Sequence, residues 1–180
     1  YLGVRGRFEW KDGDLPRATR TFTEMYEYCM RQGQHARAID AAHMVAVTGT
    51  PDQQVEWGRK GILAAEAAGD EGWLGPLWNN LGWTLDKEGK YEEALDALRR
   101  ARHFHWKMGD ELAKLIADWA VGHALRRVGK PQDALAWIRP VLAWAERRQL
   151  ENPTPDAAEW VGHACRELGE IEHAQGHRDA

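Results

Sequence analysis

The chain has 180 residues, a formal net charge of −4 and 43% hydrophobic residues. This composition supports a packed core, and the weakly acidic balance argues against a nucleic-acid or anionic-membrane binder. No apolar run approaches the roughly 20 residues that a membrane-spanning helix needs. Cys29 and Cys165 lie far apart in the sequence, and we expect two free thiols in a reducing cytoplasm.

Helical spacing of apolar residues, interrupted by glycine turns, divides the whole chain into five hairpins. Each hairpin is predicted to be two amphipathic helices joined by a short turn, because glycine can adopt the left-handed conformation that ends a helix. The first hairpin consists of helices at residues 1–12 and 16–31, and the last ends with a short polar helix at 170–180. The predicted units are 1–33, 34–69, 70–109, 110–149 and 150–180, with turns at Gly13, Gly49, Gly89, Gly129 and Gly169.

Small residues recur at fixed distances from these turn glycines. Seven residues before each turn glycine a glycine or alanine is found, and five residues after it an alanine, with Gln54 as the exception. Such a pattern indicates places where two helices approach closely. A hairpin cannot bury its apolar faces alone, so the repeats are expected to stack into one array. The small residues before the turn are Gly6, Ala42, Gly82, Gly122 and Gly162, and the alanines after it are Ala18, Ala94, Ala134 and Ala174.

Residues 78–101 resemble a tetratricopeptide repeat (TPR) of the longer, roughly 40-residue variety found in bacterial signalling regulators and kinesin-light-chain-like adaptors. The resemblance implies an all-α, right-handed superhelical α-solenoid of about five hairpins, with a peptide-binding groove lined by the first helix of each hairpin. We also expect the chain to be a fragment of a longer protein. The residues that carry the resemblance are Trp78, Leu81, Gly82, Gly89, Tyr91, Ala94, Leu98 and Ala101.

The resemblance also implies which first-helix positions would contact a ligand, namely those about ten, six, three and two residues before each turn glycine. Among them, Trp83 and Trp119 would be apolar anchors, while Arg126, Arg127 and Arg166 would contact anionic groups. The alternative is that the tryptophans only pack neighbouring helices and that the arginines form a solvated face. The predicted groove residues are Arg7, Trp10, His43, Asn79, Trp83, Lys87, Trp119, His123, Arg126, Arg127, His163 and Arg166.

Catalytic and metal-binding signals are weak. His123 and His163 occupy equivalent positions in adjacent repeats, but zinc needs three or four ligands and only glutamates stand nearby. The sequence has no phosphate-binding glycine loop, no nucleophile elbow and no pair of cysteines at redox spacing. We therefore predict no metal, no cofactor, no catalytic residue and no enzyme activity.

The sequence thus predicts a cytoplasmic, non-catalytic module that binds a protein or peptide segment with acidic and aromatic residues. Neither nucleic acid nor a membrane is an expected partner. Two alternatives stay open: a ligand- or partner-sensing array within a larger bacterial signalling or transcription regulator, and a self-associating scaffold that forms a homo-oligomer.

Overall fold

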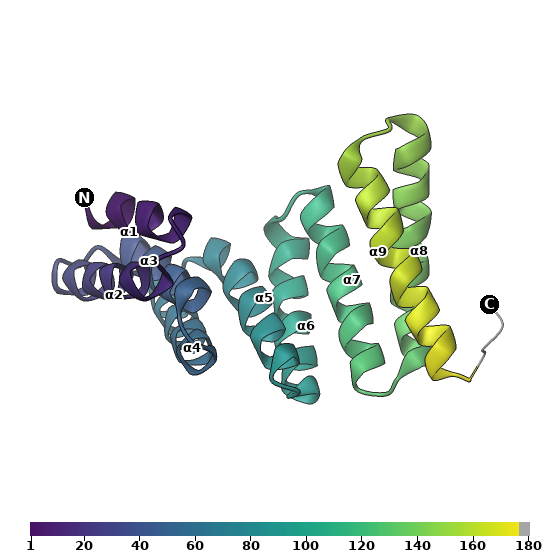
Figure 1. The fold of residues 1–180 in the computed structure, drawn as a ribbon, viewed down its shortest axis with the longest axis horizontal. Coiled ribbons are helices and arrows are strands. Elements are labelled where there is room, and N and C mark those ends of the chain that lie inside the picture. Colours follow the sequence, from purple (N-terminus) through teal and green to yellow (C-terminus); the bar gives the residue numbers. More distant parts are fainter. Residues whose placement is uncertain (177–180) are drawn as a thin grey trace. The chain divides into compact units, whose positions relative to one another are not determined.

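A computed structural model describes residues 1–176 and shows an all-α chain, as predicted (Figure 1). Within these residues the structure has nine α-helices and no strand. The first eight helices pair into four hairpins along the chain. Their bounds are α1 Leu2–Lys11, α2 Leu15–Arg31, α3 His35–Thr48, α4 Pro51–Ala68, α5 Glu71–Lys87, α6 Tyr91–Met108, α7 Glu111–Arg127, α8 Pro131–Glu151 and α9 Pro155–Ala174.

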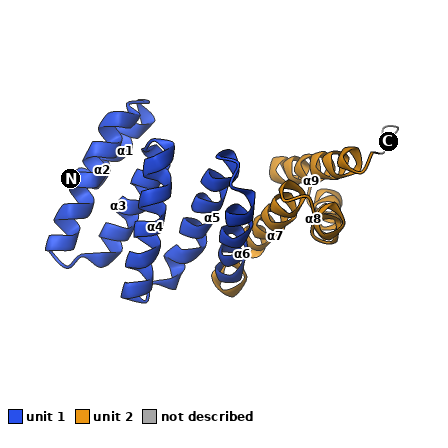
Figure 2. Ribbon diagram, turned by 90° about the horizontal axis from the view of Figure 1, so that it is seen from below, with its two compact units in different colours: residues 1–104 blue, residues 105–180 orange. Residues whose placement is uncertain are grey.

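The helices form two compact units, residues 1–104 (unit 1) and residues 105–180 (unit 2), which Figure 2 colours blue and orange. In unit 1, α3 packs against both α2 and α4, and it also touches α5, the first helix of the next hairpin. In unit 2, α8 packs against both α7 and α9, and α7 touches α9. Each unit is therefore built from consecutive helices in contact, as a stacked repeat requires.

The helix ends follow the capping chemistry that the sequence indicates. The Asp14 side chain accepts a hydrogen bond from the backbone N–H of Arg17 at the start of α2. Thr50 and Gln53 form a reciprocal capping box at the start of α4. The turn at Gly89 has a φ of 77°, in the left-handed region that glycine favours.

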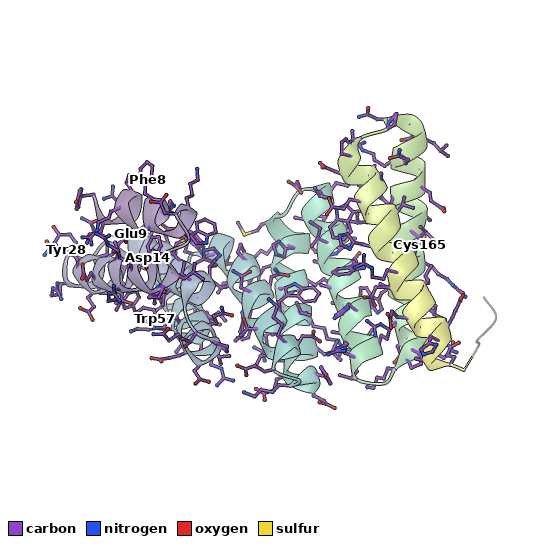
Figure 3. The ribbon with its side chains drawn as sticks, in the orientation of Figure 1. Phe8, Glu9, Asp14, Tyr28, Trp57 and Cys165 are labelled. Carbon is purple, nitrogen blue, oxygen red and sulfur yellow. The ribbon has the colours of Figure 1, made fainter. Side chains whose placement is uncertain are left out.

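A buried carboxylate connects the first two helices. Glu9 of α1 is only 7% exposed, and it accepts hydrogen bonds from Thr21 Oγ1 of α2 at 2.6 Å and from Arg5 Nε at 2.8 Å. Arg17 Nε of α2 lies 2.9 Å from the same carboxylate. Figure 3 labels Glu9 in this part of unit 1. This arrangement keeps the charge of Glu9 compensated where it is shielded from water.

The predicted close helix contacts are confirmed at three of the repeat glycines. A Cβ added to Gly82 would lie 2.6 Å from Leu98 Cγ, and one added to Gly122 would lie 2.5 Å from Ile138 Cδ1. At Gly6 it would lie 2.7 Å from a phenylalanine ring of α2. In each case the residue seven before the turn lets the second helix of the same hairpin approach.

The predicted fifth hairpin is wrong within the described residues. Helix α9 continues through Gly169 to Ala174 without a turn, so no second helix begins at residue 170; residues 177–180 lie outside the described part. Nothing lies within 4 Å of a Cβ added to Gly162, and Ala174 is exposed. The reason is energetic: Gly169 costs a helix about 1 kcal/mol, whereas continuing it buries Ile171 completely, which contributes about 1.5–3 kcal/mol.

Candidate functional site

In unit 1, the first helices of neighbouring hairpins are joined by polar side chains. Arg7 Nη2 of α1 donates to both carboxylate oxygens of Asp40 on α3, at 2.8 and 2.9 Å. His43 Nε2 of α3 lies 3.0 Å from Asn80 Nδ2 of α5, within hydrogen-bonding distance. Both pairs connect a residue six before one turn to a residue nine before the next. Two of the predicted groove residues, Arg7 and His43, are therefore used for contacts between first helices.

The His43 ring is half-buried beside an aromatic neighbour. Its ring centroid lies 5.4 Å from that of Trp73, and the rings are tilted by 52°. Burial lowers the pKa of His43, and the nearby Arg7 lowers it further, whereas Asp40 acts in the opposite direction. The neutral imidazole is accordingly the favoured form near neutral pH, and it suits a hydrogen bond with an uncharged amide.

The other predicted groove residues of unit 1 do not form a polar cluster. Trp10 is 43% exposed near the end of α1, and Lys87 is exposed at the end of α5. Asn79 and Trp83 are half-buried on α5. Among residues 1–176, neither Trp10, Asn79 nor Lys87 makes a side-chain hydrogen bond or ion pair.

In unit 2, four aromatic rings from α7 and α9 meet, and we call them the aromatic cluster: Trp119, His123, Trp160 and His163. Trp119 stacks on His123 with centroids 5.6 Å apart, and it meets Trp160 edge-on at 5.6 Å. The His163 ring lies 5.4 Å from Trp119 and 5.0 Å from Trp160. All four side chains are half-buried, so the cluster is packed internally and still reaches the surface.

Beside the aromatic cluster lies an ion-pair network, the ionic triad of His123, Arg126 and Glu167. Glu167 is 4% exposed, and its Oε2 accepts a hydrogen bond from Arg126 Nε at 2.8 Å. Its Oε1 lies 2.8 Å from His123 Nδ1, which donates when it carries the proton. Burial alone would raise the pKa of Glu167. The hydrogen bonds that His123 and Arg126 make with the carboxylate, together with their positive charges, have the larger effect and lower the pKa to about 2.

The ionic triad limits what Arg126 can offer to a ligand. Its guanidinium already holds Glu167, and its Nη1 also lies 4.0 Å from Glu170. Arg127 is half-buried, and Arg166 is exposed on α9. The predicted arginine group is thus divided between a structural member, Arg126, and a solvent-accessible member, Arg166.

Sequence reasoning missed the partners of the predicted residues. Asp40, Asn80 and Trp160 all stand nine residues before a turn glycine, or its equivalent, a position that we did not assign to the groove. Polar or aromatic residues at that position were the available signal. Glu167 stands two residues before Gly169, at one of the predicted ligand-contacting positions, but its pairing with His123 and Arg126 was not predicted, because that pairing depends on how far α9 is shifted along α7.

Trp160 also lines a neighbouring hollow of about 320 Å³, which Trp144 of α8 borders from the other side. The Trp144 indole N–H donates to Glu111 Oε1 at 2.8 Å. Within residues 1–176, no group of three or more histidine, cysteine, aspartate or glutamate side chains is placed to hold a metal ion. Over the same residues, no helix is long and apolar enough to cross a membrane.

Comparison with known proteins agrees with the repeat pattern. Residues 75–103 match the model of the tetratricopeptide repeat family. The fold is similar to the crystal structure of the nearly identical TPR-like repeats of a Podosopora anserina protein described as a kinesin light chain: the TM-score is 0.76 at 15% identity, over 98% of this chain and 86% of that one. A single-substitution variant of that protein gives a TM-score of 0.77 at 16% identity, with the same coverage. None of the curated proteins matches the sequence.

These comparisons confirm the predicted resemblance to tetratricopeptide repeats and the predicted fold class, an all-α helical-repeat solenoid. The third predicted unit, where the motif residues are most complete, is the part that the family model matches.

Proposed function

We propose that this chain is a non-catalytic interaction module that binds a peptide segment of a partner protein on the α7–α9 side of unit 2. A TPR-like fold is consistent with protein interaction. The observation that carries the proposal is the aromatic cluster, where four half-buried rings from two first helices reach the surface together.

The aromatic cluster offers the chemistry of a binding hot spot. Tryptophan contributes large contact areas at low cost in conformational entropy, and such residues dominate the energetics of many interfaces. Trp119 and Trp160 are held edge-to-face, so their orientation is set before a ligand arrives. The contacts of Glu167 with His123 and Arg126 hold both side chains in place, which reduces the loss of side-chain freedom on binding.

The partner segment that best complements this surface carries aromatic or aliphatic side chains next to carboxylates. Arg166 is exposed on α9, the helix that supplies Trp160 and His163, and its guanidinium suits a carboxylate. Because this contact would be solvent-exposed, its contribution should weaken with salt. The aromatic contribution should persist.

The test begins with random 12-residue peptides displayed on phage and selected on the immobilised 180-residue chain. The dissociation constant of a selected peptide is then measured by fluorescence anisotropy for the unaltered chain, for Trp160→Ala and for the control Trp106→Ala. Trp106 is 47% exposed but lies on α6, a second helix. We expect Trp160→Ala to weaken binding at least about tenfold, the scale of a hot-spot residue, and Trp106→Ala to change it less than about twofold.

Equal effects of the two substitutions, or selected peptides that lack carboxylates beside aromatic or aliphatic side chains, would contradict the proposal. Light scattering on the same samples provides a separate control. A mass that rises with protein concentration and returns to that of one chain in Trp160→Ala would indicate self-association through the aromatic cluster instead of peptide binding.

A further inference from the structure

A different surface, on the second helices of unit 1, has the properties of a binding groove. A hollow of about 670 Å³ opens between α4 and α6, with α5 at its base. Ile62 and Leu63 of α4 and Ala97 of α6 form apolar parts of its walls, and Leu81 and Leu85 of α5 lie at its floor. We use the name α4–α6 groove for this hollow together with a second hollow that continues it along α4.

An exposed leucine marks the edge of the α4–α6 groove. Leu63 is 66% exposed, whereas Leu81 and Leu85 on the floor are only 3% and 2% exposed. Leu63 therefore extends the apolar floor to the surface without being covered by unit 1 itself. Because about two thirds of Leu63 is exposed, a partner that covered it fully would gain about 1–2 kcal/mol, which corresponds to a factor of about five to thirty in affinity.

The groove is long. A second hollow of about 460 Å³ shares Arg59 and Leu63 with the first and extends along α4 to Asp52 and across to Lys90. Together the two hollows follow α4 from residue 52 to residue 66, about 21 Å at the helical rise of 1.5 Å per residue. A track of this length matches a segment of polypeptide about four helical turns long.

The charges along the groove are mainly negative. Seven carboxylates and four cations line the two hollows. Each cation is already engaged within unit 1, three of them with carboxylates and one with aromatic rings. The contacts are Arg59 with Glu93 at 3.2 Å, Arg100 with Asp96 at 2.8 Å, Lys90 with Glu88 at 2.7 Å, and Lys60 at 4.0 Å from the Trp57 ring centroid.

The remaining carboxylates lack such compensation. Asp52, Glu56, Glu66 and Glu92 make no ion pair among the described residues. Glu66 and Glu92 line the first hollow with its apolar floor, and Asp52 and Glu56 line the second hollow. These carboxylates are complementary to positive charges on a partner. Such complementarity would favour one orientation of the partner over others.

We propose that the α4–α6 groove binds an amphipathic helix of a partner protein that carries leucine-type side chains on one face and lysine or arginine residues beside that face. Such a helix would lie between α4 and α6 as a further helix of the stack, with its apolar anchors spaced by three and four residues over Leu63 and the floor. Its cations would meet Glu66 and Glu92.

The probe for this proposal is an 18-residue synthetic helix with leucines at helical spacing and lysines flanking them, labelled for fluorescence anisotropy. A matched peptide has glutamate in place of every lysine. With the whole 180-residue chain, we expect the lysine peptide to bind at least about tenfold more tightly than the glutamate peptide, and its affinity to fall as salt is raised.

Two substitutions locate the binding. Leu63→Glu should weaken binding of the lysine peptide at least about tenfold. The control, Leu150→Glu, alters a leucine that is 86% exposed in unit 2 and should change the affinity less than about twofold. Reversing the charge of the groove with Glu66→Lys and Glu92→Lys should weaken the lysine peptide and strengthen the glutamate peptide. All four residues are exposed, so circular dichroism should show unchanged helix content.

The proposal is overturned if both peptides bind equally, or if Leu63→Glu and Leu150→Glu have the same effect. A mass that rises with protein concentration and is reduced by Leu63→Glu would identify a second copy as the occupant and would also overturn it. The outcome is separable from the function proposed for unit 2, because Trp160→Ala should leave binding of the lysine peptide within about twofold.

Discussion

The repeat glycines of unit 2 allow a paired experiment in which the same substitution should have different effects on stability. Gly122 and Gly162 occupy equivalent positions in the similar segments 121–130 and 161–170, which are identical at six of ten residues. A Cβ at Gly122 would lie 2.5 Å from Ile138 Cδ1 and 3.1 Å from Trp137 Cβ, whereas nothing lies within 4 Å of one at Gly162. We therefore compare Gly122→Ala with Gly162→Ala.

The expected magnitudes follow from two terms. Alanine is favoured over glycine inside a helix by about 1 kcal/mol, and both glycines are helical, so both variants receive this term. Only Gly122→Ala adds overpacking, because Ile138 is fully buried and has little room to move. Overpacking of this kind costs about 1–3 kcal/mol. Gly162→Ala should thus be about 1 kcal/mol more stable than the unaltered chain. Gly122→Ala should be about 1–3 kcal/mol less stable than Gly162→Ala.

Urea unfolding followed by circular dichroism at 222 nm measures the free energy of unfolding of both variants and of the unaltered chain. The slopes with urea should agree, so that midpoints report stability alone. If Gly122→Ala is as stable as Gly162→Ala, the close approach of α8 to α7 at Gly122 is not a packing constraint and the interpretation of the repeat pattern is wrong.

Three further predictions concern individual side chains. Because the pKa of Glu167 is lowered to about 2, its ionised form should contribute at most about 3 kcal/mol of stability above pH 4.5, and this should be lost as the pH falls from 4.5 to 2. Acid titration of unfolding in Glu167→Gln should lack this loss, whereas Glu170→Gln, at an exposed carboxylate, should retain it. The pKa of His43, measured by its NMR titration, should lie below 6.5 because the ring is buried, and a value above 6.5 would contradict the structure. A thiol reagent should modify Cys165 immediately, because this residue is exposed on α9 (Figure 3), whereas buried Cys29 should react only when the chain unfolds. Simultaneous modification of both cysteines would show that α2 is not packed as described.

The sequence was sufficient for the elements whose signal is local. The turn at Gly89 and the close contacts at Gly82 and Gly122 were predictable, because a helical period and a small residue at a fixed offset directly reflect the packing of one hairpin. The same pattern was misleading at Gly162 and Gly169. There the small residues recur at the same offsets in the sequence, but within the described residues no second helix forms that could pack against them.

The candidate site depended on information that periodicity does not contain. The pattern identified the face that carries His43 and Arg126, but not the side chains of the adjacent helix that meet them. Asn80 contacts His43, and Glu167 contacts Arg126, because neighbouring first helices are shifted along one another by a particular amount. That shift results from packing along the whole length of both helices, so it was not readable from one repeat.

The most direct test of the central claim, that unit 2 binds a peptide through its aromatic cluster, is a 19F NMR titration of the chain labelled with 5-fluorotryptophan. The chain has ten tryptophans, which are assigned by single replacement with phenylalanine. On addition of a selected peptide, the resonances of Trp119 and Trp160 should shift most, while that of Trp57, buried in unit 1, should stay in place. Shifts confined to tryptophans of unit 1, with Trp119 and Trp160 unchanged, would contradict the account.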